Sequence, residues 1–237
     1  MILDIIIPVF HEEENILKTL NLLERDVKTS SNILICYDYD SDPTLNEIEK
    51  FKSKNHKIIL VKNLGNGVAS AIKTGLRKSK SDFLIIYNAD DYHNSSLIDQ
   101  MVSIGLKGYD IIAPSRYIKG GKSEGVRFSK SIVAYVGSWI CYYILRFPIR
   151  DITYCFRMFS KRVIESFKVE SLDGFTIVME YTVKAHRRNF NLVELPGIHI
   201  ERTKGQSKFK LIKWLPKYFI WVIYLFNTNL KKIFGYD

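Results

Sequence analysis

Short apolar segments alternate with segments of helical periodicity throughout the first half of the chain. Asp42 followed by Pro43 is typical of a helix N-cap with proline at the first helical position. This rhythm predicts an α/β fold, with a mostly parallel twisted sheet and helices on both of its faces. The expected strands are residues 3–9, 33–37, 57–61, 83–87 and 110–113, and the expected helices are residues 12–23, 42–51, 67–78 and 95–104.

The second half of the chain is less regular and rich in aromatic residues. Residues 131–147 and 175–187 have helical character, and residues 191–199 have extended character. The terminal segment, residues 209–237, mixes aromatic side chains with lysines, and Pro216 is expected to break it. Such amphipathic helices occur in protein cores or at membrane interfaces. The mixture of aromatic and basic residues favours an interfacial segment on an anionic membrane.

The chain of 237 residues has a formal net charge of +10, which is unevenly distributed. Residues 1–100 contain 12 Lys and Arg against 15 Asp and Glu, whereas residues 101–237 contain 23 against 10. The second half is therefore expected to face an anionic partner, such as phosphates or lipid headgroups. Nucleic acid is not expected, because the basic residues lie in no recognised nucleic-acid-binding module.

Cysteine usage and hydropathy bear on where the protein works. Cys36, Cys141 and Cys155 are far apart and lack metal-ligand spacing, which is typical of buried thiols in a reducing compartment. The N-terminus lacks the features of a signal peptide, and no uncharged apolar run has the length of a membrane span. These patterns predict a cytoplasmic protein, bound peripherally to the cytoplasmic face of the membrane.

Asn88-Ala89-Asp90 directly follows the apolar segment 83–87. Ligands of open α/β sheets bind beyond the carboxyl ends of such strands, where a carboxylate can hold Mg²⁺ or Mn²⁺ against a diphosphate. Asn88 offers only a neutral oxygen, so Asp90 is expected to be the main metal ligand, with Asn88 a weak ligand and Asp91 a possible one. Asn88→Asp is then expected to tighten metal binding. The alternative to a metal site is that Asp90, Asp91 and His93 form a solvated acidic turn.

Two other clusters could bind a nucleotide. Asp38 follows the second expected strand and could accept hydrogen bonds from a base or ribose, although an acidic turn is equally consistent with the spacing. Residues 202–208 place Arg202, Ser207 and Lys208 around a glycine. This segment is expected either to clamp a diphosphate, with Arg202 binding its oxygens bidentately, or to form a basic surface loop.

In order and spacing, these residues resemble the family 2 glycosyltransferases, and within them the dolichol- or polyprenyl-phosphate mannosyltransferase type. The similarity covers the chain up to about residue 208. The matching blocks are Pro8-Val9-Phe10-His11-Glu12, Tyr37-Asp38, Asn88-Ala89-Asp90 at the family's Asp-x-Asp position, Ser115-Arg116-Tyr117, Arg127, Asp151-x-Thr153-x-x-Phe156-Arg157, Met179-Glu180 and Arg202-x-x-Gly205-x-Ser207-Lys208.

The resemblance implies a GT-A fold over residues 1–208, followed by the membrane-interface segment 209–237. Residues 1–114 would bind a GDP- or UDP-sugar, and residues 115–208 would bind the acceptor. The resemblance implies that the donor contacts Pro8, Phe10, Glu12, Asp38, Asn88, Ala89, Asp90 and Arg116. It implies that phosphates contact Arg116, Arg127, Arg202, Ser207 and Lys208.

The implied reaction is inverting transfer, in which a metal on Asp90 and the cation Arg202 neutralise charge on the departing diphosphate. A polyprenyl phosphate acceptor is already an anion and needs no base. A saccharide hydroxyl needs a carboxylate base, for which Glu180 is the candidate. The lone Glu180 and the basic second half favour the lipid phosphate. The remaining alternative is a non-catalytic nucleotide-sugar-binding protein, which the departure at Asn88 suggests.

Overall fold

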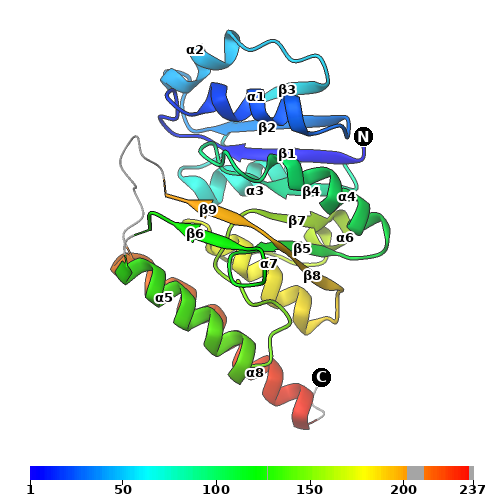
Figure 1. Ribbon diagram of the computed structural model, residues 1–237, viewed down its shortest axis with the longest axis vertical. Helices are drawn as coiled ribbons and strands as arrows, with labels where there is room; N and C mark the ends of the chain where they lie inside the picture. The colour runs from blue at the N-terminus through cyan, green and yellow to red at the C-terminus, as the bar shows by residue number, and fades with distance from the viewer. Residues whose placement is uncertain (127, 202–210, 235–237) are drawn as a thin grey trace.

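The fold comes from a computed structural model of the chain that describes residues 1–126, 128–201 and 211–234 (Figure 1). Its centre is a seven-stranded sheet in the order β3-β2-β1-β4-β7-β5-β8, accompanied by a two-stranded sheet, β6-β9. The strands are β1 (Leu3–Pro8), β2 (Ser31–Tyr37), β3 (His56–Lys62), β4 (Phe83–Ile86), β5 (Ile111–Ser115), β6 (Lys122–Glu124), β7 (Arg157–Ser160), β8 (Leu192–Pro196) and β9 (Ile198–Ile200). The helices are α1 (Ile16–Asp26), α2 (Pro43–Glu49), α3 (Val68–Lys78), η1 (Ser95–Leu97), α4 (Ile98–Leu106), α5 (Phe128–Trp139), η2 (Ile140–Ile144), α6 (Lys161–Glu165), α7 (Thr176–Arg187) and α8 (Leu211–Phe234).

The first half of the chain confirms the expected alternation of strands and helices. β1 lies between β2 and β4 and is parallel to both. Ile5 and Ile7 pack into a core that includes residues of α1 and α4, whereas Ile6 packs into a second core with residues of α3 and α7. Successive side chains of a strand point to opposite faces of the sheet. One continuous apolar segment therefore supplies two hydrophobic cores, as in sheets covered by helices on both sides.

β7 interrupts the parallel arrangement, and the sequence analysis did not expect it. β7 lies between β4 and β5 and is antiparallel to both. Its four residues are buried, and Met158 and Phe159 belong to the cores on opposite faces of the sheet. β7 follows α5 and η2 in the chain but has only four residues, Arg157–Ser160, and this short segment gave no strand signal in the sequence.

The expectation that Pro216 breaks the terminal segment was wrong. α8 continues through Pro216 from Leu211 to Phe234. Proline lacks the backbone N–H that would bond to the carbonyl four residues earlier. Pro216 lies close to the N-terminus of α8. The helix therefore lacks one backbone hydrogen bond in its N-terminal turns and continues beyond it.

α8 is amphipathic and packs against α7. Trp221 and Leu225 are buried in a cluster that includes Met179 and Val183 of α7. Other large apolar side chains of α8 are exposed, as are several on α5 and η2. Exposed examples are Ile132, Tyr135, Val136, Trp139, Tyr143, Leu215, Phe219, Ile220, Ile223 and Phe226. Among the helices in the described part of the chain, none is long and apolar enough to span a membrane.

Candidate active site

A cavity of about 700 Å³ begins at the carboxyl ends of β1 and β4 and continues between helices of the second half. Its polar part contains all the residues predicted to bind the nucleotide sugar: Pro8, Phe10, Glu12, Asp38, Asn88, Ala89, Asp90 and Arg116. Its apolar part is lined from α5, η2 and α8 by Ala134, Gly137, Ile140, Leu215, Phe219 and Val222. The structure therefore joins a polar site at the sheet edge to an apolar channel.

Asp38 shapes the end of the cavity next to α3. Its carboxylate accepts hydrogen bonds from Asn63 Nδ2 at 2.7 Å and from the Gly67 backbone N–H at 2.9 Å. Gly67 also lines the cavity and has φ +80°, a conformation that L side chains rarely adopt. These bonds fix the carboxylate at the carboxyl end of β2, where the sequence analysis placed a nucleoside-binding group.

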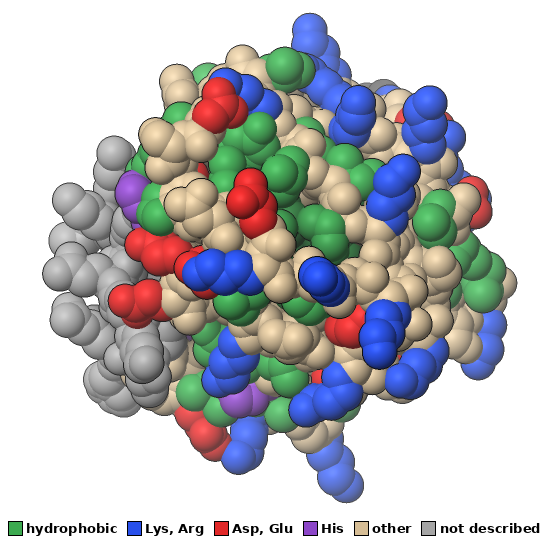
Figure 2. Space-filling model, turned by 90° about the horizontal axis from the view of Figure 1, so that it is seen from above, with side chains coloured by type: hydrophobic (Ala, Val, Ile, Leu, Met, Phe, Trp, Pro, Cys, Tyr) green, Lys and Arg blue, Asp and Glu red, His purple; other side chains and the backbone are tan. Residues whose placement is uncertain are grey.

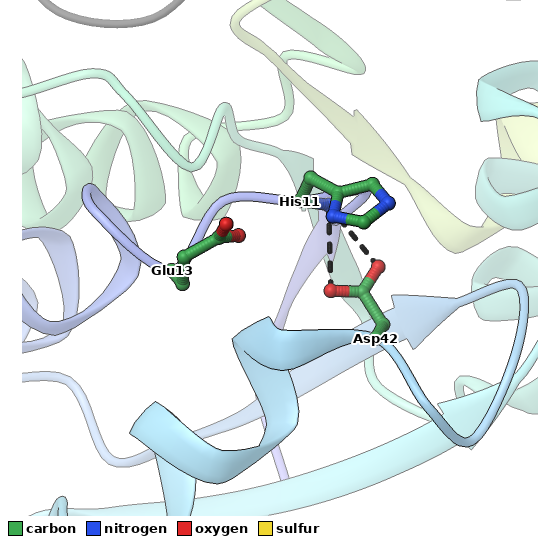
Figure 3. Close-up of side chains that lie close together, drawn as sticks. All are labelled: His11, Glu13 and Asp42. Atoms are coloured by element: carbon green, nitrogen blue, oxygen red, sulfur yellow. Dashed lines mark hydrogen bonds between the residues drawn. The ribbon is translucent and has the colours of Figure 1, made fainter.

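His11, Glu13 and Asp42 form a cluster beside this end of the cavity that the sequence analysis did not identify. One possible ligand atom from each lies within 4.8 Å of the others, and Figure 3 shows both carboxylates pointing toward His11. By ligand type and spacing the cluster could hold a metal ion. Asp42 also accepts hydrogen bonds from the His11 and Thr44 backbone N–H groups, so it anchors the turn after β1 to the start of α2. The three residues do not line the cavity.

Asn88 and Asp90 both line the cavity after β4. The Asn88 side chain contacts Cys155, with Nδ2 at 3.2 Å and Oδ1 at 3.4 Å from Sγ. Cys155 lines the same cavity, and burial raises the pKa of its thiol to about 11, so the thiol is protonated at neutral pH. No sequence pattern indicates this pair, because the two residues lie 67 positions apart in the chain.

Asp91 is buried and lies outside the cavity lining. Its carboxylate accepts hydrogen bonds from the His93 and Asn94 backbone N–H groups, from Asn94 Nδ2 and from the Tyr154 hydroxyl. Burial raises the pKa of Asp91, although these bonds oppose the shift. Through these hydrogen bonds Asp91 stabilises the turn after β4. Its carboxylate is turned to these partners and away from the cavity lining, which does not favour the suggested metal-binding role.

Arg116 lines the polar part of the cavity. Its Nε and Nη2 donate to the two oxygens of Asp151 at 2.6 and 2.8 Å, and Nη2 also donates to Thr153. Burial alone would lower the pKa of Arg116, but the charge of Asp151 raises it above its ordinary value. The guanidinium is therefore a fixed positive charge in the cavity wall, suited to a phosphate.

Glu180, the candidate base for a hydroxyl acceptor, lies on α7. It is fully buried in α7 and does not line the cavity. Its carboxylate accepts hydrogen bonds from the backbone N–H groups of Glu170 and Ser171, both at 2.7 Å, and from Lys184 Nζ at 2.6 Å. Through these hydrogen bonds Glu180 holds the segment before α7 against that helix.

The predicted phosphate-binding residues Arg127, Arg202, Ser207 and Lys208 lie outside the described residues. Figure 2 views the end of the molecule that carries α2 and β3, where Lys and Arg side chains are spread over the face and do not gather in one patch. Within the described part of the chain, Arg116 is the arginine that lines the cavity.

The sheet order, with helices on both faces, defines an α/β fold of the GT-A type. Residues 4–167 match the family described as Glycosyl transferase family 2. The chain therefore belongs to glycosyl transferase family 2, which confirms the resemblance seen in its motifs.

The relatives include two lipid-phosphate mannosyltransferases. The dolichol-phosphate mannosyltransferase of Pyrococcus furiosus is 28% identical over 214 residues, which are 89% of this chain and 60% of that protein. The undecaprenyl-phosphate mannosyltransferase of Micrococcus luteus is 24% identical over 209 residues, 86% of this chain and 85% of that protein. This chain thus spans well under two thirds of the first relative's length.

Solved structures support the fold. The glucosyl-3-phosphoglycerate synthase of Mycobacterium tuberculosis, in complex with Mn²⁺, UDP and glucosyl-3-phosphoglycerate, has a TM-score of 0.68 at 9% identity. The match covers 95% of this chain and 80% of that one. The same enzyme has been solved with Mg²⁺ and UDP, again with a TM-score of 0.68. At this identity, the likeness establishes the GT-A fold alone.

Proposed function

We propose that the protein transfers a sugar, with inversion, from a nucleoside-diphosphate sugar to a polyprenyl phosphate at the membrane surface. The observation that carries this proposal is the continuity of the cavity. Its polar part contains Asp38, Asp90 and Arg116, and its apolar part runs between α5 and α8. An acceptor with one anionic end and a long apolar chain matches both parts. The names of the mannosyltransferase relatives support the same acceptor class.

Each part of the donor has chemically suitable residues around it. Pro8, Phe10, Glu12 and Asp38 would hold the nucleoside of a GDP- or UDP-sugar. Asp90 has the hard carboxylate oxygen that Mg²⁺ and Mn²⁺ prefer, so the residues present fit a divalent cation. When bound, such a cation neutralises charge on the diphosphate leaving group.

Arg116 would bind the acceptor phosphate near the donor, and its pairing with Asp151 fixes the direction of its guanidinium. The acceptor oxygen then attacks the anomeric carbon from the face opposite the diphosphate, which inverts the configuration. A phosphate oxygen carries the required negative charge, so no proton has to be removed during the attack. This agrees with Glu180 lying outside the cavity lining.

The exposed apolar side chains of α5, η2 and α8 would place the mouth of the apolar channel against a lipid surface. Trp139 and Tyr143 are 44% and 58% exposed, and aromatic side chains of this kind favour the headgroup region. Phe219 on α8 is similarly exposed. We place the enzyme on the cytoplasmic face of the membrane, in keeping with its free cysteines.

Direct assay tests the proposed function. The protein is incubated with vesicles that contain polyprenyl phosphate, with Mn²⁺, and with labelled GDP- and UDP-sugars in turn. We expect label in the lipid fraction for at least one donor, and none when polyprenyl alcohol replaces the phosphate. Failure of every common donor to label the lipid would contradict the proposal.

Glu180→Gln separates this proposal from transfer to a saccharide hydroxyl. If Glu180 were the base, its loss should reduce turnover by about 10²- to 10⁴-fold. Because its carboxylate instead binds Lys184 and two backbone N–H groups, we expect a lower thermal midpoint and nearly unchanged turnover per folded molecule. Initial rates normalised to the folded fraction provide the measurement. A large loss of turnover without a loss of stability would favour the hydroxyl acceptor.

Gly137→Leu tests the apolar channel. A Cβ atom at Gly137 would meet no atom within 4 Å, so a larger side chain enters the channel without disturbing the fold. We expect it to cost roughly 1–3 kcal/mol of acceptor binding, or about 5- to 150-fold in acceptor KM. The measurement is KM for a long polyprenyl phosphate. KM for the nucleotide sugar should not change.

The neighbouring variant Val136→Leu is the matched control, since Val136 is 46% exposed and lies outside the cavity lining. It should leave both KM values unchanged. Equal acceptor KM values for Gly137→Leu and the wild type would show that the lipid does not occupy this channel.

A further inference from the structure

His11, Glu13 and Asp42 bring one imidazole and two carboxylates together beside the end of the cavity that Asp38 shapes (Figure 3). His11 and Glu13 lie between β1 and α1, and Asp42 is the N-cap of α2. One ligand atom from each residue lies within 4.8 Å of the others. Because none of the three lines the cavity, the cluster is separate from the site that contains Asp90.

One carboxylate oxygen of this cluster is buried without a partner. Glu13 Oε2 accepts no hydrogen bond from any described residue, and Figure 3 shows its carboxylate pointing toward His11. In the described part of the chain, no Lys or Arg forms an ion pair with Glu13 or Asp42, and Lys62 pairs with Asp40 instead. A buried oxygen that lacks a donor costs free energy. A bound cation would remove this cost.

Tyr39 shows that the surroundings of the cluster are negatively charged. Desolvation and the charges of Asp42, Asp38 and Glu13 raise the pKa of the Tyr39 hydroxyl. This hydroxyl is hydrogen-bonded to Nε2 of His11, which leaves Nδ1 as the ring nitrogen available to a cation. The second ring nitrogen of a metal-binding histidine is usually held by a hydrogen bond of this kind.

The ligand set indicates Zn²⁺. Zinc binds histidine nitrogen and carboxylate oxygen, often with three protein ligands and one water, whereas Mg²⁺ and Ca²⁺ prefer oxygen ligands alone. At zinc–ligand distances of about 2.1 Å, tetrahedral ligand atoms lie roughly 3.4 Å apart. The cluster therefore has to contract by at most roughly 1.4 Å from its present 4.8 Å. The side chain of His11 is exposed and can make this movement.

A cation at this position would join two loops that already share hydrogen bonds. The His11 backbone N–H donates to Asp42 Oδ2 at 3.1 Å, and the Glu12 backbone N–H donates to Thr44 Oγ1 at 2.8 Å. Phe10 and Glu12, the residues on either side of His11, both line the cavity. Fixing His11 to α2 would therefore also fix part of the cavity wall.

We propose that His11, Glu13 and Asp42 form a second divalent-cation site, of the Zn²⁺ type, which fastens the turn after β1 to the N-terminus of α2. The cation is held outside the cavity and stabilises the wall that carries Phe10 and Glu12. The proposal does not depend on the transfer reaction proposed above or on a cation at Asp90.

The test measures Zn²⁺ binding directly. The full chain is stripped of metal with a chelator and titrated with Zn²⁺ alone, in competition with a chromophoric chelator and without nucleotide. His11 has φ +54°, a conformation that Asn tolerates, so His11→Asn removes the imidazole without straining the turn. We expect His11→Asn and Glu13→Gln each to weaken Zn²⁺ binding at least about tenfold. X-ray absorption at the zinc edge should show nitrogen and oxygen ligands and no sulfur, which excludes the cysteines.

Hydrogen exchange tests whether the cation fastens the turn. In the wild type, Zn²⁺ should slow exchange of the His11 and Glu12 backbone N–H groups, which bond across the two loops. The same concentration of Zn²⁺ should have no such effect in Glu13→Gln. Zinc binding at the cluster without slower exchange would overturn the fastening role.

Glu14→Gln is the matched control, because Glu14 is the exposed neighbour of Glu13 and is not part of the cluster. It should retain the wild-type affinity for Zn²⁺, as should Asp90→Ala. Absence of saturable Zn²⁺ binding, sulfur in the zinc shell, or equal affinity in the wild type, His11→Asn and Glu13→Gln would each overturn the site. Failure of sugar transfer in the lipid assay would contradict the proposed function and leave this site standing.

Discussion

Asp90→Ala is expected to reduce sugar transfer by about 10³-fold, the effect of removing a major electrostatic stabiliser of a charged transition state. Asp90 lines the polar part of the cavity beyond β4, where the donor diphosphate would lie. Without its carboxylate the proposed cation would lose its principal ligand, and the leaving group would retain its charge. The measurement is kcat/KM for the nucleotide sugar at saturating acceptor, together with Mn²⁺ affinity in the presence of the nucleotide.

Asp82→Ala provides the matched control. Asp82 is exposed and precedes β4, so it lies at the opposite end of the same strand from Asp90. Its loss should change neither the transfer rate nor the affinity for Mn²⁺. If Asp90→Ala retained a tenth of the wild-type rate with unchanged Mn²⁺ affinity, another group would have to hold the cation.

The parallel half of the fold could be predicted because its information is local. A strand buried on both faces needs a continuous apolar segment, and each crossover helix needs its own periodicity; α2 also has a side-chain cap. Asp42 shows this directly, since it accepts the Thr44 backbone N–H as an N-cap should. By contrast, β7 has only four residues and pairs with strands distant in sequence. Its place depends on tertiary contacts that no local pattern encodes.

The same distinction holds for the site. Asp38 and Asp90 could be located because each follows a strand whose carboxyl end faces the cavity. The pairing of Asn88 with Cys155 and the link that Asn94 makes between Asp91 and Ile198 depend on residues far apart in the chain. Residue type alone left Glu180 as a candidate base for a hydroxyl acceptor only. Its burial and its hydrogen bonds to Lys184 and to the segment before α7 depend on the packed structure.

The largest expected loss of stability comes from Asp151→Ala. Asp151 is fully buried, and its carboxylate binds the Arg116 backbone N–H and guanidinium, as well as the Tyr154 backbone N–H. Removing one partner of a buried ion pair leaves the other charge uncompensated, which typically costs about 3–5 kcal/mol. The free energy of unfolding, measured by urea titration, should fall by about that amount. Asp40→Ala removes an exposed partner of Lys62 and should have little effect.

The pH dependence of this loss can be derived from the pKa of Asp151. Burial alone would raise that pKa, but the charge and hydrogen bonds of Arg116 lower it below its ordinary value. A carboxyl group whose pKa is lower in the folded state stabilises the protein above its unfolded pKa, about 3.9. The stabilisation is lost as the pH falls through the folded pKa. The difference between wild type and Asp151→Ala should therefore be constant near neutral pH and shrink below about pH 4.

The double variant Arg116→Met with Asp151→Leu distinguishes an uncompensated charge from a simple loss of packing. Replacing both members of a buried ion pair with apolar side chains is often neutral or stabilising. We therefore expect the double variant to recover most of the stability that Asp151→Ala loses, while its transfer activity stays low because the guanidinium proposed to bind phosphate is absent. A double variant as unstable as Asp151→Ala would show that Asp151 stabilises the fold mainly through its bonds to the backbone.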